Sequence, residues 1–253
     1  LFNNCIYLLS IYENPKYHMK KTILITGGAG FIGSNLIEKL LHLKHEVTVI
    51  DNFSTGRLEN IKLYAKNIKI INADISKKGN WQKSFKNKDV VFHLAALADI
   101  VPSITNAESY FRSNVVGTYN VLQACKLNKV KKIIYSASSS CYGIPKKYPT
   151  PETEKINCKY PYSLTKFMGE ELVLHWGKVY KIDAISLRFF NVYGLKSRTS
   201  GTYGAVFGVF LAQKLANKPF TIVGDGKQTR DFTYISDIVE ALLISSQSNL
   251  KNQ

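Results

Sequence analysis

Residues 26–33, with the sequence Thr-Gly-Gly-Ala-Gly-Phe-Ile-Gly, constrain the fold of this chain more than any other stretch. They follow an apolar run at residues 22–25 that is typical of a buried strand. They precede residues 31–43, in which apolar side chains recur at helical spacing. A strand that leads through a glycine-rich turn into a helix predicts a dinucleotide-binding unit. The same glycines outside that context indicate only a flexible turn.

Each glycine of this turn meets a physical demand. Gly27 lets the chain turn sharply off the strand, Gly30 lets a pyrophosphate approach the backbone, and Gly33 lets the helix pack close to the sheet. The helix N-terminus offers unpaired N–H groups and a positive dipole end to phosphates. The sequence therefore predicts cofactor contacts at Gly27, Gly30, Phe31, Ile32 and Gly33.

Four further apolar segments, residues 46–50, 68–71, 89–94 and 132–135, are typical of strands. Helical segments separate strands of this kind, and the longest of them is predicted over residues 110–127. Strands and helices that alternate in this way predict an α/β fold with a doubly wound parallel sheet and right-handed crossovers.

The chain is expected to fall into three parts. Residues 1–18 precede a methionine and lack a signal-peptide pattern, so they are interpreted as an upstream leader outside the fold. Residues 19–187 are the expected dinucleotide-binding domain. Residues 188–253 are expected to form a small, truncated substrate-binding domain.

The composition excludes several classes of protein. The 253 residues carry a net charge of +16, but the lysines are scattered rather than gathered in a stripe with aromatic residues, so nucleic-acid binding is not expected. No run of about 18 apolar residues occurs, so no membrane span is expected. The cysteines match no zinc or disulfide pattern and are expected to be reduced thiols of a cytoplasmic protein: Cys5, Cys125, Cys141 and Cys158.

Two residues at strand ends bear on the cofactor. Asp51 ends the second strand, where an acid accepts hydrogen bonds from the adenosine ribose and repels a 2′-phosphate, so it favours NAD over NADP. The alternative is a turn aspartate in the pair Asp51-Asn52, and Arg57 lies near enough to serve a 2′-phosphate. His93, in the apolar fourth strand, is interpreted as a packed core histidine rather than a catalytic base.

The chemistry is expected where the fifth strand ends, at the serine cluster 138–140, and at Tyr162 and Lys166. Ligands of open α/β sheets bind outside the carboxyl ends of the strands, although a serine-rich turn alone indicates little. Tyr162 and Lys166 are four residues apart and share one face of a helix. An ammonium near a phenol lowers the phenol's pKa from about 10 toward neutrality, which makes Tyr162 a candidate general base.

Together these motifs resemble the extended short-chain dehydrogenase/reductase family, whose members act on nucleotide sugars and share the Rossmann fold. The resemblance runs from about residue 20 to the end of the chain. The matching segments are residues 26–33, 51–52, 74–75, 93–96, 138, 162, 166, 188–194 and 224–232.

The resemblance implies a role for each matching residue. Ser138, Tyr162 and Lys166 would be the catalytic triad, and Lys166 would also bind the nicotinamide ribose of NAD. The substrate, a UDP-sugar, would contact Ser139, Ser140, Asn191 and Arg230. The remaining cofactor contacts would come from Asp51, Asn52, Asp74, Ile75, Leu94, Ala95, Ala96 and Asn114.

The residues after Ser138 bear on the type of reaction. Dehydratase and decarboxylase relatives carry carboxylates there, whereas this chain has Ser139 and Ser140 and so resembles the UDP-hexose 4-epimerases. In the implied mechanism, Tyr162 deprotonates the sugar 4-hydroxyl while bound NAD oxidises C4. The 4-keto sugar then rotates and is reduced on its other face.

The chain departs from the family pattern at residues 97–99. The family often has a lysine or another polar group just after the two alanines, and this chain has Leu-Ala-Asp, so the substrate contacts at these positions stay open.

Other interpretations remain open. The chain would be a dehydratase of the same family if the reaction released water, a decarboxylase if it released CO₂, and a reductase if it consumed external NAD(P)H. It would be a non-catalytic NAD-binding fragment if no turnover occurred. The resemblance also implies a homodimer that pairs through helices at residues 110–127 and 160–176.

Overall fold

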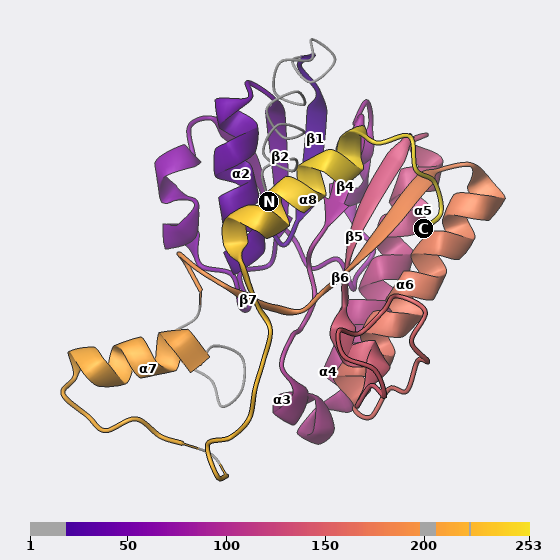
Figure 1. Ribbon diagram of the computed structural model, residues 1–253. Coiled ribbons are helices and arrows are strands. Elements are labelled where there is room, and N and C mark those ends of the chain that lie inside the picture. Colours follow the sequence, from indigo (N-terminus) through magenta and orange to yellow (C-terminus); the bar gives the residue numbers. More distant parts are fainter. Residues whose placement is uncertain (1–18, 198–205, 223) are drawn as a thin grey trace, which may run out of the picture.

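A computed structural model describes residues 19–197, 206–222 and 224–253 (Figure 1). The expected leader, residues 1–18, lies outside the described residues. The main sheet contains six strands: β1 (Thr22–Thr26), β2 (Glu46–Asp51), β3 (Ile68–Asn72), β4 (Val90–His93), β5 (Lys132–Ser138) and β6 (Asp183–Phe189).

All neighbouring strands of this sheet run parallel, in the order β3-β2-β1-β4-β5-β6. The chain thus moves outward from β1 on one side and then returns to continue on the other. The expected doubly wound Rossmann fold is confirmed. Strand order reverses between β1 and β4, and Thr26 pairs there with Ile50 on one side and His93 on the other. Ligands of such sheets bind at this reversal, outside the carboxyl ends of the strands.

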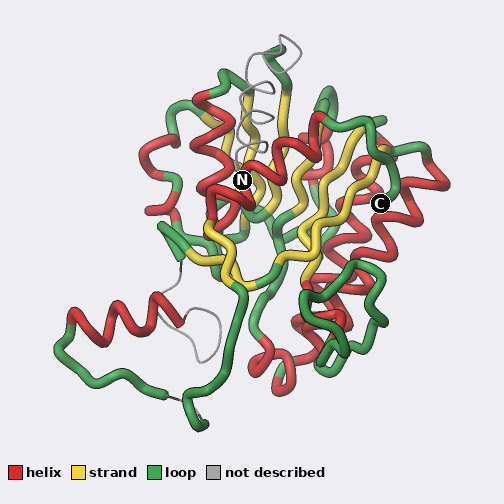
Figure 2. The backbone as a smooth tube through the Cα atoms, in the orientation of Figure 1, coloured by secondary structure: helices red, strands yellow, loops and turns green. Residues whose placement is uncertain are grey.

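Helices cover both faces of the sheet (Figures 1 and 2). Successive strand residues point to opposite faces, so Ile23 and Ile25 join one buried cluster while Leu24 joins the other. The first cluster is closed by α2 and α8, and the second by α5 and α6. The main helices are α2 (Phe31–His42), α3 (Ile100–Thr105), α4 (Ala107–Phe111), α5 (Gly117–Leu127), α6 (Pro161–Tyr180), α7 (Val206–Leu215) and α8 (Ile235–Gln247).

The helix predicted over residues 110–127 is interrupted. It consists of α4, a π-helical turn η5 (Arg112–Val116) and α5. A π-turn adds a residue to the helical repeat and commonly marks a functional position. Here it carries Asn114, whose side chain bonds outside the helix. Short 3₁₀ turns also occur: η2 (Leu58–Asn60), η3 (Lys62–Tyr64), η4 (Asn80–Phe85) and η6 (Ser139–Tyr142).

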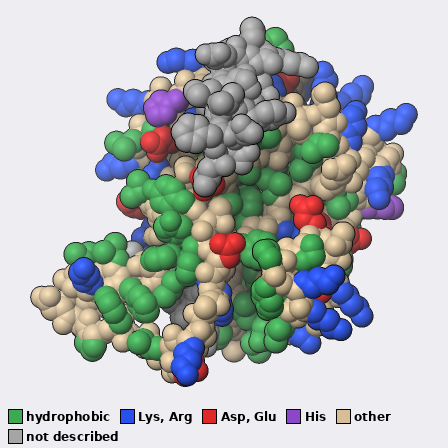
Figure 3. Space-filling model, viewed as in Figure 1, with side chains coloured by type: hydrophobic (Ala, Val, Ile, Leu, Met, Phe, Trp, Pro, Cys, Tyr) green, Lys and Arg blue, Asp and Glu red, His purple; other side chains and the backbone are tan. Residues whose placement is uncertain are grey.

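The C-terminal part leaves the sheet and then returns to it. β7 (Asn191–Tyr193) pairs with β8 (Phe232–Tyr234), and α8 then packs against α2. The segment with α7 extends away from the sheet in Figure 1, and Figure 3 shows hydrophobic side chains gathered over it. The domain boundary expected at residue 188 stays a prediction. Helix α8 lies beyond that boundary in the chain, yet it belongs to the same hydrophobic cluster as β1.

Two findings concern other sequence expectations. No helix within the described ranges is both long and apolar enough to cross a membrane. Three of the four cysteines lie in the described ranges, and all three are free thiols: Cys125, Cys141 and Cys158.

Candidate active site

The glycine turn packs directly against the end of β4. Gly27 has a φ of 74°, which strongly favours glycine, and its N–H donates to the carbonyl of Ile50 at 2.8 Å. A Cβ on Gly27 would lie 2.7 Å from Ala95 Cα, so only glycine fits here. Leu94 and Ala95 are thereby brought beside the turn. Their N–H groups donate to Thr26, to its carbonyl at 3.1 Å and its hydroxyl at 3.3 Å respectively.

The start of α2 is shaped for an anion. The sequence predicted that Gly33 lets the helix pack close to the sheet. In the structure a Cβ on Gly33 would instead lie 2.7 Å from Gly28 Cα, so Gly33 lets the helix pack against the glycine turn. A Cβ on Gly30 would meet only the carbonyl oxygen of Gly27, at 3.2 Å, and otherwise faces open space. No side chain among the described residues caps the helix, so its first amides remain available to a phosphate.

Asp51 braces this turn. Its carboxylate is 7% exposed and accepts hydrogen bonds from the N–H groups of Ala29 and Phe53, both at 2.9 Å. Each oxygen keeps a further lone pair, so the predicted ribose contact is compatible with these bonds and stays a prediction. Asn52 is exposed and accepts from the Ser54 N–H at 3.1 Å, which is the turn geometry considered from the sequence.

The other predicted cofactor contacts lie at strand ends and on the π-turn. Asp74 accepts from the Ser76 N–H at 2.9 Å, while Ile75 is buried at 6% exposure in the second core cluster. Asn114 is buried; its Oδ1 accepts from the Leu97 N–H at 2.8 Å, and its Nδ2 donates to the Leu97 carbonyl at 3.0 Å. Ala96 lies between Ala95 and Leu97, the residue whose backbone Asn114 holds. None of these geometries tests the predicted cofactor contacts.

The serine cluster and Tyr162 meet. Ser138 ends β5, and its hydroxyl lies 2.8 Å from that of Ser140 and accepts from the Ser140 N–H at 3.3 Å. The Ser138 hydroxyl also hydrogen-bonds the phenol of Tyr162, in the first turn of α6. Ser139 begins the η6 turn between them in the chain. Residues 24 positions apart in sequence thus form one polar cluster.

The expectation that Lys166 makes the Tyr162 phenol acidic is wrong. Burial raises the pKa of Tyr162; the hydrogen bond from Ser138 opposes this shift, and the charge of Asp99 adds to it. The Lys166 ammonium instead lies 4.3 Å from the centre of the Tyr135 ring. Burial lowers the pKa of Lys166 to about 7, because a charged amine is poorly solvated inside the protein. The amine does stay out of bulk water, at 3% exposure of its residue.

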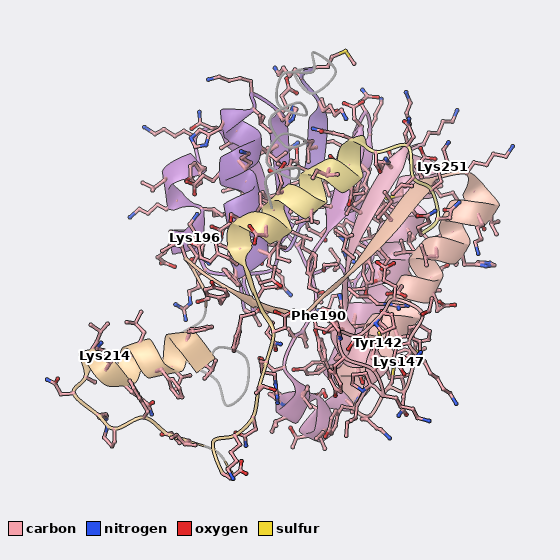
Figure 4. All side chains as sticks on the ribbon, in the orientation of Figure 1. Tyr142, Lys147, Phe190, Lys196, Lys214 and Lys251 are labelled. Carbon is pink, nitrogen blue, oxygen red and sulfur yellow. The ribbon has the colours of Figure 1, made fainter. Side chains whose placement is uncertain are left out.

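Sequence reasoning assigned no role to an ion pair beneath this helix. Glu170, one turn after Lys166, accepts from the Nε of Arg188 at 3.1 Å and from its Nη2 at 2.5 Å. The Arg188 Nη1 donates to the Tyr142 hydroxyl at 2.8 Å, and Figure 4 shows Tyr142 beside α6. The carboxylate of Glu170 also raises the pKa of Lys166 against the effect of burial. Its i+4 spacing from Lys166 was the available sequence signal.

His93 is a core residue, as the sequence interpretation held. It is fully buried, and its two ring nitrogens are hydrogen-bonded to the hydroxyls of Thr26 at 2.7 Å and Thr118 at 2.8 Å. Burial lowers its pKa to about 3, so the ring is neutral at physiological pH. With both nitrogens engaged, it has no lone pair or proton to offer a substrate.

Of the predicted diphosphate contacts, Asn191 begins β7 and Arg230 lies in the loop before β8. The side chain of Asn191 donates to the carbonyl of Asp231 at 3.0 Å, and Asp231 is the residue that follows Arg230 in the sequence. Arg230 is exposed, and its Nη1 donates to the Thr229 carbonyl at 2.7 Å. The loop after β7 is tied to α2: Lys196 donates to Glu38 at 3.1 Å and lies beside α2 in Figure 4.

Comparison with known proteins agrees with this geometry. The sequence profile of the NAD dependent epimerase/dehydratase family matches residues 23–252. A Methanocaldococcus jannaschii protein provisionally named a UDP-glucose 4-epimerase is 38% identical over 233 residues, which are 91% of this chain and 74% of that protein. A UDP-N-acetyl-alpha-D-glucosaminuronate decarboxylase of Bacillus cytotoxicus is 34% identical over 240 residues, covering 93% of this chain and 74% of that one.

Solved structures share the fold, and one of them contains NAD. A UDP-N-acetylglucosamine 4-epimerase from Methanobrevibacter ruminantium, in complex with UDP-N-acetylmuramic acid, superposes with a TM-score of 0.87 at 36% identity, over 92% of this chain and 74% of that one. A UDP-glucuronic acid 4-epimerase from Bacillus cereus, bound to UDP-glucuronic acid and NAD, gives 0.83 at 35% identity, over 91% and 74%.

Proposed function

The chain belongs to the NAD-dependent epimerase/dehydratase family, and on that premise we propose that it inverts C4 of a UDP-hexose with NAD as its cofactor. The family also contains dehydratases and decarboxylases, so the reaction itself is inferred from this chain's own residues. The observation that carries the proposal is the polar cluster of Ser138, Ser140 and Tyr162, in which the two residues that follow Ser138 carry hydroxyls and not carboxylates.

A carboxylate beside the serine would favour elimination. Removing water from C5 and C6 of a sugar needs a second acid–base pair in addition to the group that serves the 4-hydroxyl. Here η6 begins with Ser139 and Ser140, and the Ser140 hydroxyl is hydrogen-bonded to Ser138 rather than placed next to an acid. Hydroxyls bind and orient a sugar, but they do not ionise at neutral pH. This favours reversible oxidation at C4 alone.

The residues of the glycine turn fit NAD. The space at Gly30 and the uncapped amides of α2 suit a pyrophosphate, and the acid at position 51 suits a ribose with both hydroxyls unmodified. Lys166 would hold the second ribose, next to the nicotinamide. NAD supplies a reversible hydride acceptor when bound.

The chain's own residues would divide the remaining work. Tyr162 takes the proton of the 4-hydroxyl and later returns it, and Ser138 orients that hydroxyl through its own bond to the phenol. Asn191 and Arg230, both exposed on the β7–β8 side, would hold the diphosphate and leave the sugar free to turn. Because burial raises the phenol's pKa, deprotonation of Tyr162 would depend on a nearby positive charge. Lys166 lies one helical turn away and, with a pKa of about 7, is protonated in only part of the molecules at neutral pH.

Replacing Tyr162 with Phe tests the proposal. Wild-type protein is incubated with UDP-glucose and, separately, with UDP-N-acetylglucosamine, and products are identified by NMR. We expect conversion to the C4 epimer, and a loss of roughly 10³-fold in the variant because the acid–base group is gone. NAD binding should remain near the wild-type value. Tyr160→Phe removes an exposed hydroxyl two residues away and is the matched control. Undiminished turnover by Tyr162→Phe would refute the assignment.

The same incubation, repeated with a UDP-hexuronate and with added NAD(P)H, separates the alternatives. A product lighter by one water identifies a dehydratase, and release of CO₂ from the UDP-hexuronate identifies a decarboxylase. Net consumption of NAD(P)H identifies a reductase. NAD binding with no conversion of any nucleotide sugar identifies a non-catalytic binding fragment.

We also propose that the protein is a homodimer that pairs through α5 and α6. These helices pack against each other, and their outer faces carry apolar side chains that are unusually exposed, at 73% for Leu127 and 52% for Val179. Tyr119, Trp176 and Tyr180 form a continuous aromatic group across both helices. Light scattering of the purified protein measures the assembly state directly.

A further inference from the structure

The small sheet formed by β7 and β8 has little support of its own. Within the described ranges it contains two strands of three residues each, and neither strand belongs to the six-stranded sheet. A strand pair of this size is at best marginally stable in isolation, so its position depends on the chain segments to which it is attached. The position of Asn191, the first residue of β7, depends on the same attachments.

One attachment is the side chain of Asn35 on α2. Its Nδ2 carries two N–H groups, which donate to the carbonyl of Phe31 at 2.9 Å and to the carbonyl of Leu195 at 3.1 Å. Phe31 is the first residue of α2, where the helix amides remain available to a phosphate. Leu195 lies in the turn directly after β7. A single amide therefore bridges the first turn of the cofactor helix and the end of β7.

The second attachment is the Lys196 ammonium, which Figure 4 shows beside α2. Its Nζ lies 3.1 Å from the Oε2 of Glu38 and donates to the carbonyl of Ser34 at 3.4 Å. The same ammonium lies 5.4 Å from the centre of the Tyr64 ring, and the Tyr64 phenol hydrogen-bonds Glu38. An isolated ion pair at the surface contributes little, but here several partners from two segments surround one half-buried ammonium. Lys196 is therefore well placed to fix the turn on α2.

The neighbouring strand reaches the same helix by another route. β8 continues directly into α8, which packs against α2. A Cβ on Gly194, the residue after β7, would lie 2.4 Å from the Ile235 side chain at the start of α8. Because β7 and β8 run parallel, their carboxyl ends lie together. Both strands thus lead into segments that are fixed to α2.

We propose that Asn35 and Lys196 are positioning residues that couple the segment holding the substrate diphosphate to the helix holding the cofactor. The inference rests on the proposed function, since it takes Asn191 as a diphosphate contact. The two residues act through the β7 segment and not on the reacting atoms. Loss of either tie frees this segment and weakens the binding of a nucleoside diphosphate, whereas the catalytic groups on β5 and α6 keep their positions.

Three variants and one control test this inference. Lys196→Met keeps an unbranched side chain and removes the charge, whereas Lys196→Arg keeps the charge. Asn35→Ala removes both donors of the bridging amide. The control, Lys20→Met, breaks an exposed ion pair with Glu46, the first residue of β2, at the end of the sheet opposite the site. The measurements on the NAD-loaded protein are the Kd for UDP by calorimetry, and kcat and KM for the UDP-hexose that it converts.

Lys196→Met and Asn35→Ala should each raise the Kd for UDP and the KM about tenfold, a size typical of coupling between sites. Because the ties serve binding and not the chemical step, kcat should stay within about twofold of wild type. Lys196→Arg and the control should bind UDP as the wild type does. A purely structural role would lower the melting temperature of the two variants and leave their Kd for UDP unchanged.

A Kd for UDP that is the same in the wild type, Lys196→Met and Asn35→Ala overturns the inference, even if both variants are less stable. In a wild type that converts a UDP-hexose, that result leaves the proposed function intact. A Kd that shifts as expected, in a protein that converts no nucleotide sugar, supports the positioning role and overturns the proposed function alone. Failure of the wild type to bind UDP overturns both.

Discussion

Substitutions at two glycines of the turn are expected to affect folding and cofactor binding separately. At Gly33 an added methyl group would lie 2.7 Å from Gly28 Cα and would also press on the Gly27 carbonyl, and both contacts are with backbone that cannot rotate away. Overpacking of this kind costs about 1–3 kcal/mol, and the better helix propensity of Ala offsets less than about 1 kcal/mol of it. We therefore expect Gly33→Ala to lower the free energy of unfolding by about 1–2 kcal/mol.

Gly30→Ala should behave in the opposite way. Its backbone has φ −74° and ψ 178°, which any residue adopts, and the new methyl group would meet only one oxygen at 3.2 Å. We expect the free energy of unfolding to stay within about 0.5 kcal/mol of wild type. The methyl group would nevertheless occupy the space proposed for the pyrophosphate, so the affinity for NAD should fall by roughly 100-fold, or about 2.7 kcal/mol.

Urea denaturation of the NAD-free proteins, followed by tryptophan fluorescence, measures the first quantity, and calorimetric titration with NAD measures the second. The two variants should separate: Gly33→Ala loses stability, while Gly30→Ala keeps its stability and loses affinity. Wild-type NAD affinity in Gly30→Ala would refute the placement of the pyrophosphate. Wild-type stability in Gly33→Ala would refute the reasoning from the close backbone contact.

Three further predictions concern α6 and its surroundings. Glu170→Gln should lower the free energy of unfolding by about 3 kcal/mol, because Arg188 loses its partner in a largely buried ion pair, and thermal or urea denaturation checks this. The same change should lower the pKa of Lys166 further and move the alkaline limb of the pH–rate profile to lower pH; an unmoved limb would contradict the coupling. Lys166 has a pKa of about 7 when folded against 10.5 in its ordinary state, so the unfolded chain binds more protons between these values and wild-type stability should rise with pH across that window. Lys166→Met lacks this titration and should exceed the wild type in stability at pH 6, with the difference shrinking toward pH 10 in urea denaturation at each pH. Leu127→Glu should convert the proposed dimer to monomer in light scattering, while an unchanged mass would place the interface elsewhere.

Local sequence determined the parts of this protein that depend on short-range spacing. Strand β1, the turn at Gly27 and the helix after it follow from apolar periodicity and from the few residues that permit a sharp turn, and the structure has them where they were expected. The four-residue separation of Tyr162 and Lys166 likewise places both in one helix. These features depend on neighbours within a few residues, so no knowledge of the distant chain is needed.

The tertiary structure decided the electrostatics. The sequence predicted an acidic phenol at Tyr162 from its spacing to Lys166, but burial raises the phenol's pKa and lowers that of the amine. The partner of Glu170 is Arg188, on the neighbouring strand, and the charge of Asp99 acts on Tyr162 although the two are 63 positions apart in the sequence. The charge state of a group depends on how much water and which charges surround it. Those surroundings exist only after distant segments have packed together.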